Sequence, residues 1–156
     1  MKKVNKLSTC IPPDLVEEII RNGREQDDQH VYRVAKRGKI DNVEFMGSYE
    51  EILYEKRTFK EDLSLIGSYS TSCYLTPKGP RKFLRFLKAG LFKTYPHPII
   101  IHGNTICGLS QLTKERIPDY PDKEHVDWWI YQDSFDKLIK EFKVFEDFNQ
   151  EGLTNE

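Results

Sequence analysis

The chain has 156 residues, which is enough for one domain with a hydrophobic core and too few for two comfortable ones. Its 24 basic and 25 acidic residues nearly cancel, and 38% of the residues are hydrophobic, so the composition is typical of a globular protein rather than a disordered one. Proteins that bind duplex nucleic acid normally carry a basic excess, so this charge balance argues against that class.

The three cysteines, Cys10, Cys73 and Cys107, are widely spaced and form no CxxC pair. An odd number of cysteines without the regular spacing of a disulfide framework is typical of proteins in a reducing compartment. No run approaches the roughly 18 apolar residues that a membrane span needs, and no apolar stretch follows the charged start. We therefore expect a soluble, cytoplasmic protein that does not associate with membranes.

Four helices are expected from capping residues and apolar spacing. Pro13 suits the first turn of a helix that Gly23 ends, and Ser48 with Glu51 has the spacing of a capping box. The expected helices are residues 13–22, residues 48–57, a third that Pro80 opens and Gly90 closes, and a fourth that Asp133 or Ser134 caps and whose apolar spacing reaches Phe145.

Five strands are expected from runs of β-branched and aromatic residues between turn residues. Gly103-Asn104 has the composition of a hairpin turn, so the strands on its two sides should pair. Their irregular spacing predicts a single α+β domain over residues 1–150, with a mixed or antiparallel central sheet flanked by helices and a flexible tail over residues 151–156. The expected strands are residues 31–36, 66–75, 98–102, 106–112 and 125–131.

A single cation, Arg33, lies within an otherwise apolar strand. It shares one face with Val31 and Ala35. A guanidinium is costly to bury unpaired, so Arg33 is half exposed at the strand end, pairs with a carboxylate of the chain, or binds a ligand. Its planar fork suits a phosphate or a carboxylate.

The expected strand 66–75 holds a run of small hydroxyl residues. Alternation would place Ser68, Ser70 and Ser72 on one nearly flat face rich in hydroxyl groups. Serines are equally ordinary on an edge or solvent-facing strand, but the large apolar residues of this segment favour a central one. We interpret the run as the floor of a pocket.

Carboxylates accompany the expected strand 125–131. Glu124 comes directly before it, where a carboxylate can overlook a cleft, and Asp127 lies within it. A core strand capped by solvated charges is the alternative. His97 and His102 lack zinc-ligand spacing, so no metal site is expected. The chain also has no GxGxxG, P-loop or HExxH motif.

Taken in chain order, Tyr32-Arg33, Ser70-Thr71-Ser72 and Glu124 form a pattern. This order resembles the Arg–Ser–Glu arrangement of the ADP-ribosyltransferase superfamily, over about residues 31–131. The family's second Glu, two residues before the catalytic one, is replaced here by Asp122, which leaves Asp127 as a rival for the catalytic role.

The resemblance implies an ADP-ribosyltransferase-like fold with NAD as the substrate. Arg33 would hold the phosphates or the nicotinamide ribose, and Ser70 would shape the nicotinamide site. Glu124, or its rival Asp127, would stabilise the oxocarbenium-like transition state as nicotinamide leaves. The residues expected to bind the dinucleotide are Tyr32, Arg33, Ser70, Thr71, Ser72 and Tyr74.

Three functions stay open at this point. The chain could be an NAD-using transferase or glycohydrolase, a nucleotide-binding protein without turnover, or an interaction module that presents its aromatic residues and the basic helix at 81–88. The enzyme requires that Arg33, Ser70 and Glu124 or Asp127 converge on one cleft. The expected partners are NAD or a related nucleotide and a possible protein acceptor.

Overall fold

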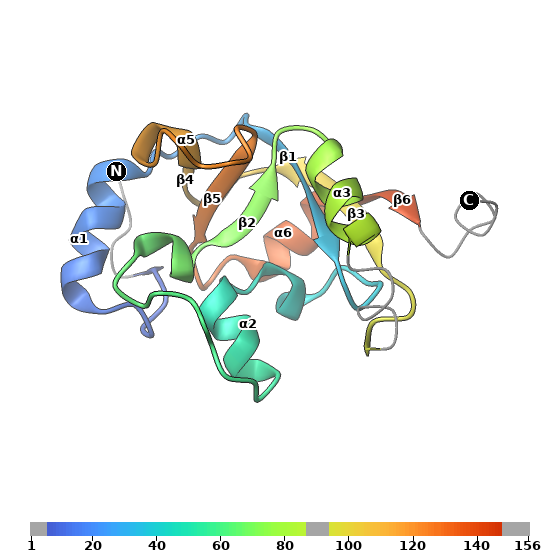
Figure 1. The fold of residues 1–156 in the computed structure, drawn as a ribbon, viewed down its shortest axis with the longest axis horizontal. Coiled ribbons are helices and arrows are strands. Elements are labelled where there is room, and N and C mark those ends of the chain that lie inside the picture. Colours follow the sequence, from blue (N-terminus) through green and yellow to red (C-terminus); the bar gives the residue numbers. More distant parts are fainter. Residues whose placement is uncertain (1–5, 87–93, 148–156) are drawn as a thin grey trace.

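The computed structural model describes residues 6–86 and 94–147. These residues form a six-stranded sheet in the order β4-β5-β2-β1-β3-β6, and each neighbouring pair is antiparallel (Figure 1). The predicted α+β class is confirmed, and the sheet is antiparallel rather than mixed. The strands are β1 (His30–Ala35), β2 (Thr71–Tyr74), β3 (Ile99–Asn104), β4 (Gly108–Leu112), β5 (His125–Ile130) and β6 (Lys143–Asp147).

Short helices pack on both faces of the sheet. In the described part of the chain, no helix is long and apolar enough to cross a membrane. The α-helices are α1 (Pro13–Asn22), α2 (Ser48–Tyr54), α3 (Lys78–Phe86), α5 (Thr113–Arg116) and α6 (Phe135–Glu141), and the 3-10 helices are η2 (Asn42–Phe45) and η3 (Ile66–Tyr69).

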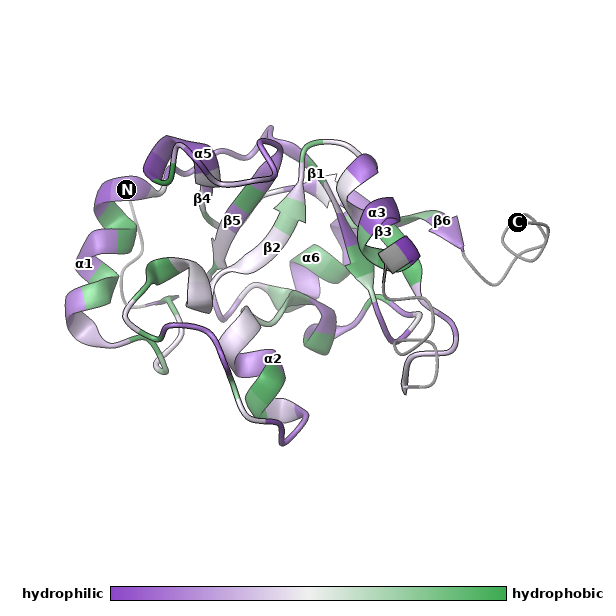
Figure 2. Cartoon of the chain, viewed as in Figure 1, coloured by the Kyte–Doolittle hydropathy of each residue, from purple (hydrophilic) through white to green (hydrophobic). Residues whose placement is uncertain are grey.

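Helix α1 begins and ends where the sequence predicts. Pro13 occupies the first turn, where its missing N–H costs no hydrogen bond, and the Gly23 N–H closes the helix on the Ile19 carbonyl at 2.7 Å. Leu15 and Ile19 are buried against the sheet, and the ribbon of α1 alternates hydrophilic and hydrophobic residues (Figure 2). Burial of one face therefore stabilises the helix.

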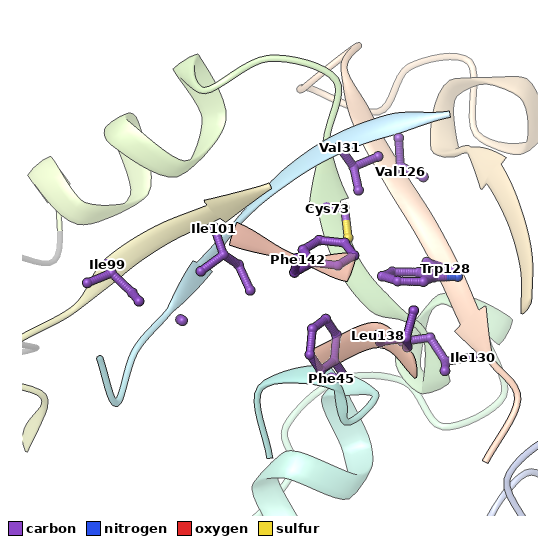
Figure 3. Close-up of a cluster of buried hydrophobic side chains, with 11 residues drawn as sticks. Val31, Phe45, Cys73, Ile99, Ile101, Val126, Trp128, Ile130, Leu138 and Phe142 are labelled. Carbon is purple, nitrogen blue, oxygen red and sulfur yellow. The ribbon is translucent and has the colours of Figure 1, made fainter. Parts of the chain in front are cut away.

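One face of the sheet, which we call the α6 face, holds the main hydrophobic core. Helix α6 and η2 cover it, and Trp128 of β5 stacks on Phe142 with ring centroids 5.7 Å apart. Figure 3 shows strand side chains meeting these aromatic rings from above. The core consists of Val31, Ala35, Phe45, Cys73, Ile99, Ile101, Val126, Trp128, Ile130, Leu138 and Phe142.

Two separate groups of helices pack on the opposite face, which we call the α3 face. Helix α1 and η3 pack over β4 and β5 through a cluster that includes Ile19, Ile66 and Trp129. Helix α3 packs over β1 and β3 through Leu84. Figure 1 shows α1 and α3 at opposite sides of this face with β2 between them. Strand β2 thus lies where the two covers part.

The predicted strand 66–75 is wrong over its first half. Ile66–Tyr69 forms η3, and the strand is Thr71–Tyr74. The Ser68 hydroxyl donates to the Asp62 carbonyl at 2.6 Å, a local bond that competes with strand pairing. Ser68 and Ser72 therefore do not share a strand face.

The predicted hairpin around Gly103-Asn104 is also wrong. Both residues belong to β3, which pairs with β1 and β6, while β4 pairs with β5 at the other end of the sheet. The turn follows instead, and Cys107 there has a positive φ of 61°.

Helix boundaries differ from the predictions in three places. The helix predicted to reach Phe145 ends at Glu141; Phe142 then enters the core of the α6 face, and Val144 and Phe145 belong to β6. Helix α2 ends at Tyr54 rather than near Arg57, and α3 begins at Lys78, two residues before Pro80. The predicted helix end at Gly90 and the predicted tail over residues 151–156 lie outside the described residues.

Gly103 is expected to be intolerant of a side chain. A Cβ there would lie 2.7 Å from Cδ1 of the buried Phe142 ring, so Gly103→Ala should destabilise the fold by about 1–3 kcal/mol, measured by urea unfolding. Gly67→Ala is the matched control, because its Cβ would meet nothing nearer than 3.4 Å. Equal stabilities of the two variants would contradict this packing.

Candidate functional site

A cleft opens where the ladder between β1 and β2 stops. Within the described residues these strands share one register pair, Tyr32 with Tyr74. Continued pairing would place Val34 opposite Ser72, but both residues instead line a cleft of about 220 Å³. The full lining is Arg33, Val34, Lys36, Met46, Ser48, Glu51, Ser72, Tyr74 and Phe83.

Arg33 lies in the gap between the two strands. Its side chain starts on the α6 face, between Val31 and Ala35, and is only 7% exposed. Its Nη1 donates to the Ser72 carbonyl at 2.6 Å, while its buried Nε has no hydrogen-bond partner among the described residues. A buried guanidinium with an unused donor is costly unless something further binds it.

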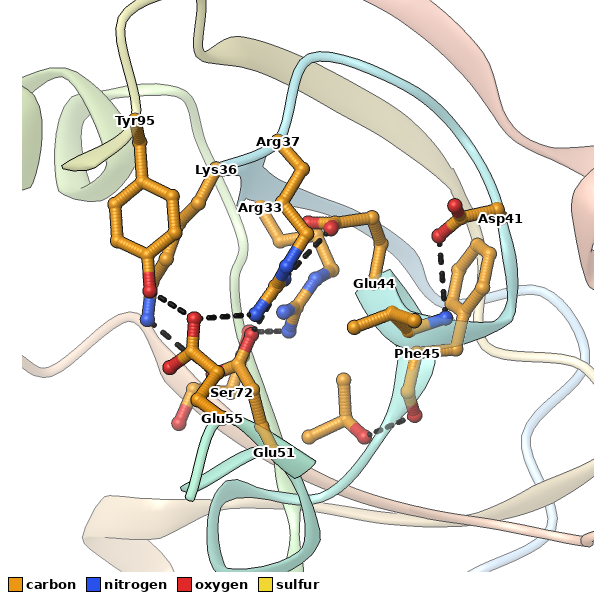
Figure 4. Close-up of polar contacts among 12 residues, drawn as sticks. Arg33, Lys36, Arg37, Asp41, Glu44, Phe45, Glu51, Glu55, Ser72 and Tyr95 are labelled. Atoms are coloured by element: carbon orange, nitrogen blue, oxygen red, sulfur yellow. Dashed lines mark hydrogen bonds and ion pairs between the residues drawn. The ribbon is translucent and has the colours of Figure 1, made fainter. Parts of the chain in front are cut away.

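Two more cations lie close to carboxylates near Arg33, and one of them, Lys36, also lines the cleft (Figure 4). Lys36 donates to Glu51 at 3.2 Å and lies over the Phe83 ring, 5.9 Å from its centroid. Arg37 holds three carboxylates at once, contacting Glu44 at 2.8 Å, Glu51 at 3.1 Å and Glu55 at 2.7 Å. Alternating charges thus join β1 to η2 and α2.

The pKa values of Glu44 and Glu55 are shifted in opposite directions within this cluster. Burial raises the pKa of Glu44 and outweighs the hydrogen bond from Arg37. Burial also opposes ionisation of Glu55, but hydrogen bonds from Tyr95 and Arg57 and the charge of Arg37 outweigh it and lower the pKa of Glu55. Glu44 is therefore the carboxylate of the pair that is held less firmly in its charged form.

Tyr74 supplies an aromatic wall of the cleft. Burial raises the pKa of its hydroxyl to about 12, so the group stays protonated at neutral pH and can donate a hydrogen bond. Its ring meets His125 edge-on at 5.3 Å. Tyr32 of β1 lies on the same face of the sheet as Tyr74, but its ring stacks on His102 at 5.6 Å and does not line the cleft.

Asp127 lies in a separate hydrogen-bonded network. Its Oδ1 accepts from Ser70 at 2.6 Å, and its Oδ2 accepts from Thr113 at 2.8 Å and Arg116 at 2.7 Å. Thr113 also contacts Nδ1 of the buried His125 at 2.6 Å. Asp127 is 2% exposed, and its two oxygens are fully engaged, so this network is suited to holding β2, β5 and α5 together.

The remaining predicted site residues have structural partners. The Thr71 hydroxyl is buried on the α6 face and donates to the Phe45 carbonyl at 2.8 Å. The Glu124 Oε1 accepts from Thr76 at 2.6 Å, beyond the end of β2. Of the six residues predicted to bind a dinucleotide, the structure brings Arg33, Ser72 and Tyr74 together at the cleft, and the other three do not line it. Ser70, Glu124 and Asp127 are not among the lining residues, so they do not converge with Arg33 on this cleft.

Sequence reasoning missed Lys36, Ser48 and Glu51 as cleft residues. Ser48 and Glu51 have capping-box spacing, but the N-cap of α2 is Gly47 and carries no side-chain cap bond. The Ser48 hydroxyl donates to the Ser70 carbonyl at 3.2 Å, and Glu51 turns toward Lys36. The available signal in the sequence was the charge of Glu51, on a helix that follows a strand with cations at its end.

Comparison of the chain with protein-family models, with curated protein sequences and with solved structures finds no match. In the part of the chain that the structure describes, no group of three or more His, Cys, Asp and Glu residues could hold a metal ion. The functional assignment therefore depends on the geometry of the cleft.

The Asp127 network is expected to contribute strongly to stability. Asp127→Asn would leave Arg116, whose side chain is 15% exposed, without its charged partner, at a cost of about 3 kcal/mol in urea unfolding. Ser70→Ala removes one neutral donor and should cost about 1.5 kcal/mol. A cost below that of Ser70→Ala for the Asp127 variant would contradict a structural role.

His125 is expected to make the fold sensitive to mild acid. Burial lowers its pKa below the ordinary value of 6.5, so below that pH the unfolded chain takes up a proton before the folded protein does. This contribution to the free energy of unfolding is present above pH 6.5 and is lost as the pH falls through the folded-state pKa. Urea unfolding at a series of pH values should give a flatter curve for His125→Gln than for the natural chain, and parallel curves would refute the assignment.

Proposed function

We propose that the protein binds a phosphate-bearing nucleotide in the cleft beside Arg33, with NAD as the candidate ligand. The observation that carries this proposal is the Arg33 guanidinium, which is 7% exposed and borders the cleft beside Lys36. Two cationic side chains on the lining of one cleft favour an anionic ligand such as a phosphate group.

The chemistry of the lining fits the parts of such a ligand. Arg33 and Lys36 supply positive charge for phosphate, and the Ser72 and Tyr74 hydroxyls suit the ribose. The Phe83 ring offers an apolar surface for a base. The cleft, at about 220 Å³, is smaller than the roughly 300–1,000 Å³ of ordinary ligand pockets, so it suits one half of a dinucleotide, with the other half outside.

The lining of the cleft lacks Ser70, Glu124 and Asp127, so the arrangement that the predicted enzyme required is not present there. Cleavage of the nicotinamide–ribose bond is therefore a second candidate function only with Glu51 in the catalytic role. Its carboxylate borders the same cleft as Arg33, whereas Glu124 and Asp127 do not. As the C–N bond breaks, its electron pair leaves with nicotinamide, positive charge develops on the ribose, and a fixed anion lowers the barrier. Water or a protein nucleophile then bonds to the ribose carbon. Lys36 and Arg37 hold Glu51 in place.

Replacement of Arg33 is expected to weaken nucleotide binding. Arg33→Lys keeps the positive charge but loses the planar fork, so the affinity for ADP-ribose in isothermal titration calorimetry should fall by about tenfold or more. Arg24→Lys is the matched control, because the Arg24 side chain is 64% exposed and lies away from the cleft. Equal affinities of the two variants, with both folded by circular dichroism, would refute the proposed site.

Glu51 is expected to be the acidic residue on which turnover depends. Incubation of the natural chain with NAD should release nicotinamide, detected by chromatography, and Glu51→Gln should abolish this release while ADP-ribose still binds. Glu115→Gln is the control, because Glu115 pairs with Arg24 away from the cleft. Loss of release in Glu124→Gln instead would return the role to the residue before β5, and no release from the natural chain would leave binding alone.

A further inference from the structure

The wall of the cleft nearest α2 belongs to a buried cluster of cations and carboxylates, and the more exposed Arg57 pairs with Glu55 at its margin. Its cations come from β1 and the two residues that follow it, and its carboxylates come from η2, from α2 and from the residue after α2. Tyr95 also donates to Glu55. The charged members are Arg33, Lys36, Arg37, Glu44, Glu51 and Glu55.

Glu44 is the least satisfied member of this cluster. It is fully buried, with an exposed fraction of 0%, and only its Oε2 receives a hydrogen bond, from Arg37. Its Oε1 has no partner among the described residues. Arg37, which supplies the one bond, is shared with Glu51 and Glu55. An ionised carboxylate in this position is poorly compensated.

The groups that face Glu44 come from each element packed against it. Arg33 of β1 and Arg37 after β1 attract its negative charge, and Glu51 of α2 repels it. Helix α6, which packs on η2, presents the apolar Leu138 to the shared core. The charge of Glu44 therefore depends on two guanidinium groups, and one of them, Arg33, borders the cleft.

We infer that binding of an anionic ligand beside Arg33 is coupled to the uptake of one proton by the Glu44 carboxylate. This inference rests on the proposed nucleotide site. A pyrophosphate group adds negative charge at the edge of the cluster, beside Arg33. Arg33 then shares its charge with the ligand, and Glu44, already poorly compensated, takes a proton from solvent.

The titration of Glu44 gives the direction of this coupling. Burial raises its pKa, and Arg37 and Arg33 partly oppose that rise. A bound anion weakens the opposition, so the pKa is higher in the complex than in the free protein. Ligand affinity is then greatest below the free-protein pKa and falls as the pH rises through the pKa of the complex, by at most about tenfold per pH unit for one proton.

The test is isothermal titration of the full chain with ADP-ribose, whose pyrophosphate diester is strongly acidic and stays fully ionised where a carboxyl group with a raised pKa titrates. Titrations at one pH in buffers with different ionisation enthalpies give the number of protons bound with the ligand. We expect up to one proton taken up per ligand at acidic pH, and an affinity that falls toward neutral pH. Binding with no proton exchange and no pH dependence would overturn the coupling and leave the nucleotide site intact.

Two isosteric variants assign the proton. Glu44→Gln should bind ADP-ribose without proton uptake, whereas Glu55→Gln should retain uptake, because the pKa of Glu55 is lowered and this group stays ionised. Uptake that persists in Glu44→Gln would assign the proton to another group, such as His125 beside Tyr74, and overturn the inference. If Glu44→Gln does not fold, proton uptake that persists in Glu51→Gln, Glu55→Gln and His125→Gln supports Glu44 by elimination of these neighbours, and loss of uptake in any one of them overturns the inference. Absence of ADP-ribose binding at every pH would refute the proposed site and the inference together.

Discussion

The hydrogen bond from Arg33 to the Ser72 carbonyl joins two halves of a sheet that otherwise separate. Beyond the Tyr32–Tyr74 pair, β1 and β2 leave a gap, and the Arg33 guanidinium lies in it. A cation placed there needs negative charge nearby, and the carboxylates of η2 and α2 supply it. The Arg33 side chain thus takes the place of further pairing between the two strands. The cleft, the charge cluster and the position of α2 all follow from this arrangement.

The molecule contains two buried polar systems of different kinds. Around Asp127, hydroxyl and guanidinium donors satisfy both carboxylate oxygens, and the arrangement holds neighbouring elements together. Around Arg33, the guanidinium Nε and the Glu44 Oε1 both stay without partners among the described residues. The polar groups of the Asp127 network are therefore more completely satisfied than those around Arg33, where the cleft leaves room for a further partner.

The sequence predicts the parts of the fold that depend on local spacing. Helix α1 has its first-turn proline and its closing glycine, and it was predicted with the observed boundaries. The faces of β1 were also predicted, because alternation fixes which residues accompany Arg33. Non-local pairing was not predictable in this way: Ser70 binds Asp127, 57 residues away, and β3 and β4 separate although only a short turn joins them.

The candidate site was predicted only in part for the same reason. Ser72 and Tyr74 share one face of β2, so their meeting follows from strand alternation, whereas Arg33 starts on the other face and reaches them because the pairing of β1 with β2 stops. Glu51 reaches the cleft through the docking of α2 on the charged end of β1, and its local spacing with Ser48 indicated a capping role instead. Helix docking through buried ion pairs leaves no periodic signal in a sequence.

A crystal structure of the protein with ADP-ribose bound would test the central claim most directly. The account predicts the pyrophosphate against the Arg33 guanidinium, in the gap between β1 and β2, with the ribose beside Ser72 and Tyr74. A pyrophosphate bound elsewhere, with the Arg33 Nε contacting only an ordered water, would contradict it and assign Arg33 to the structure of the sheet alone.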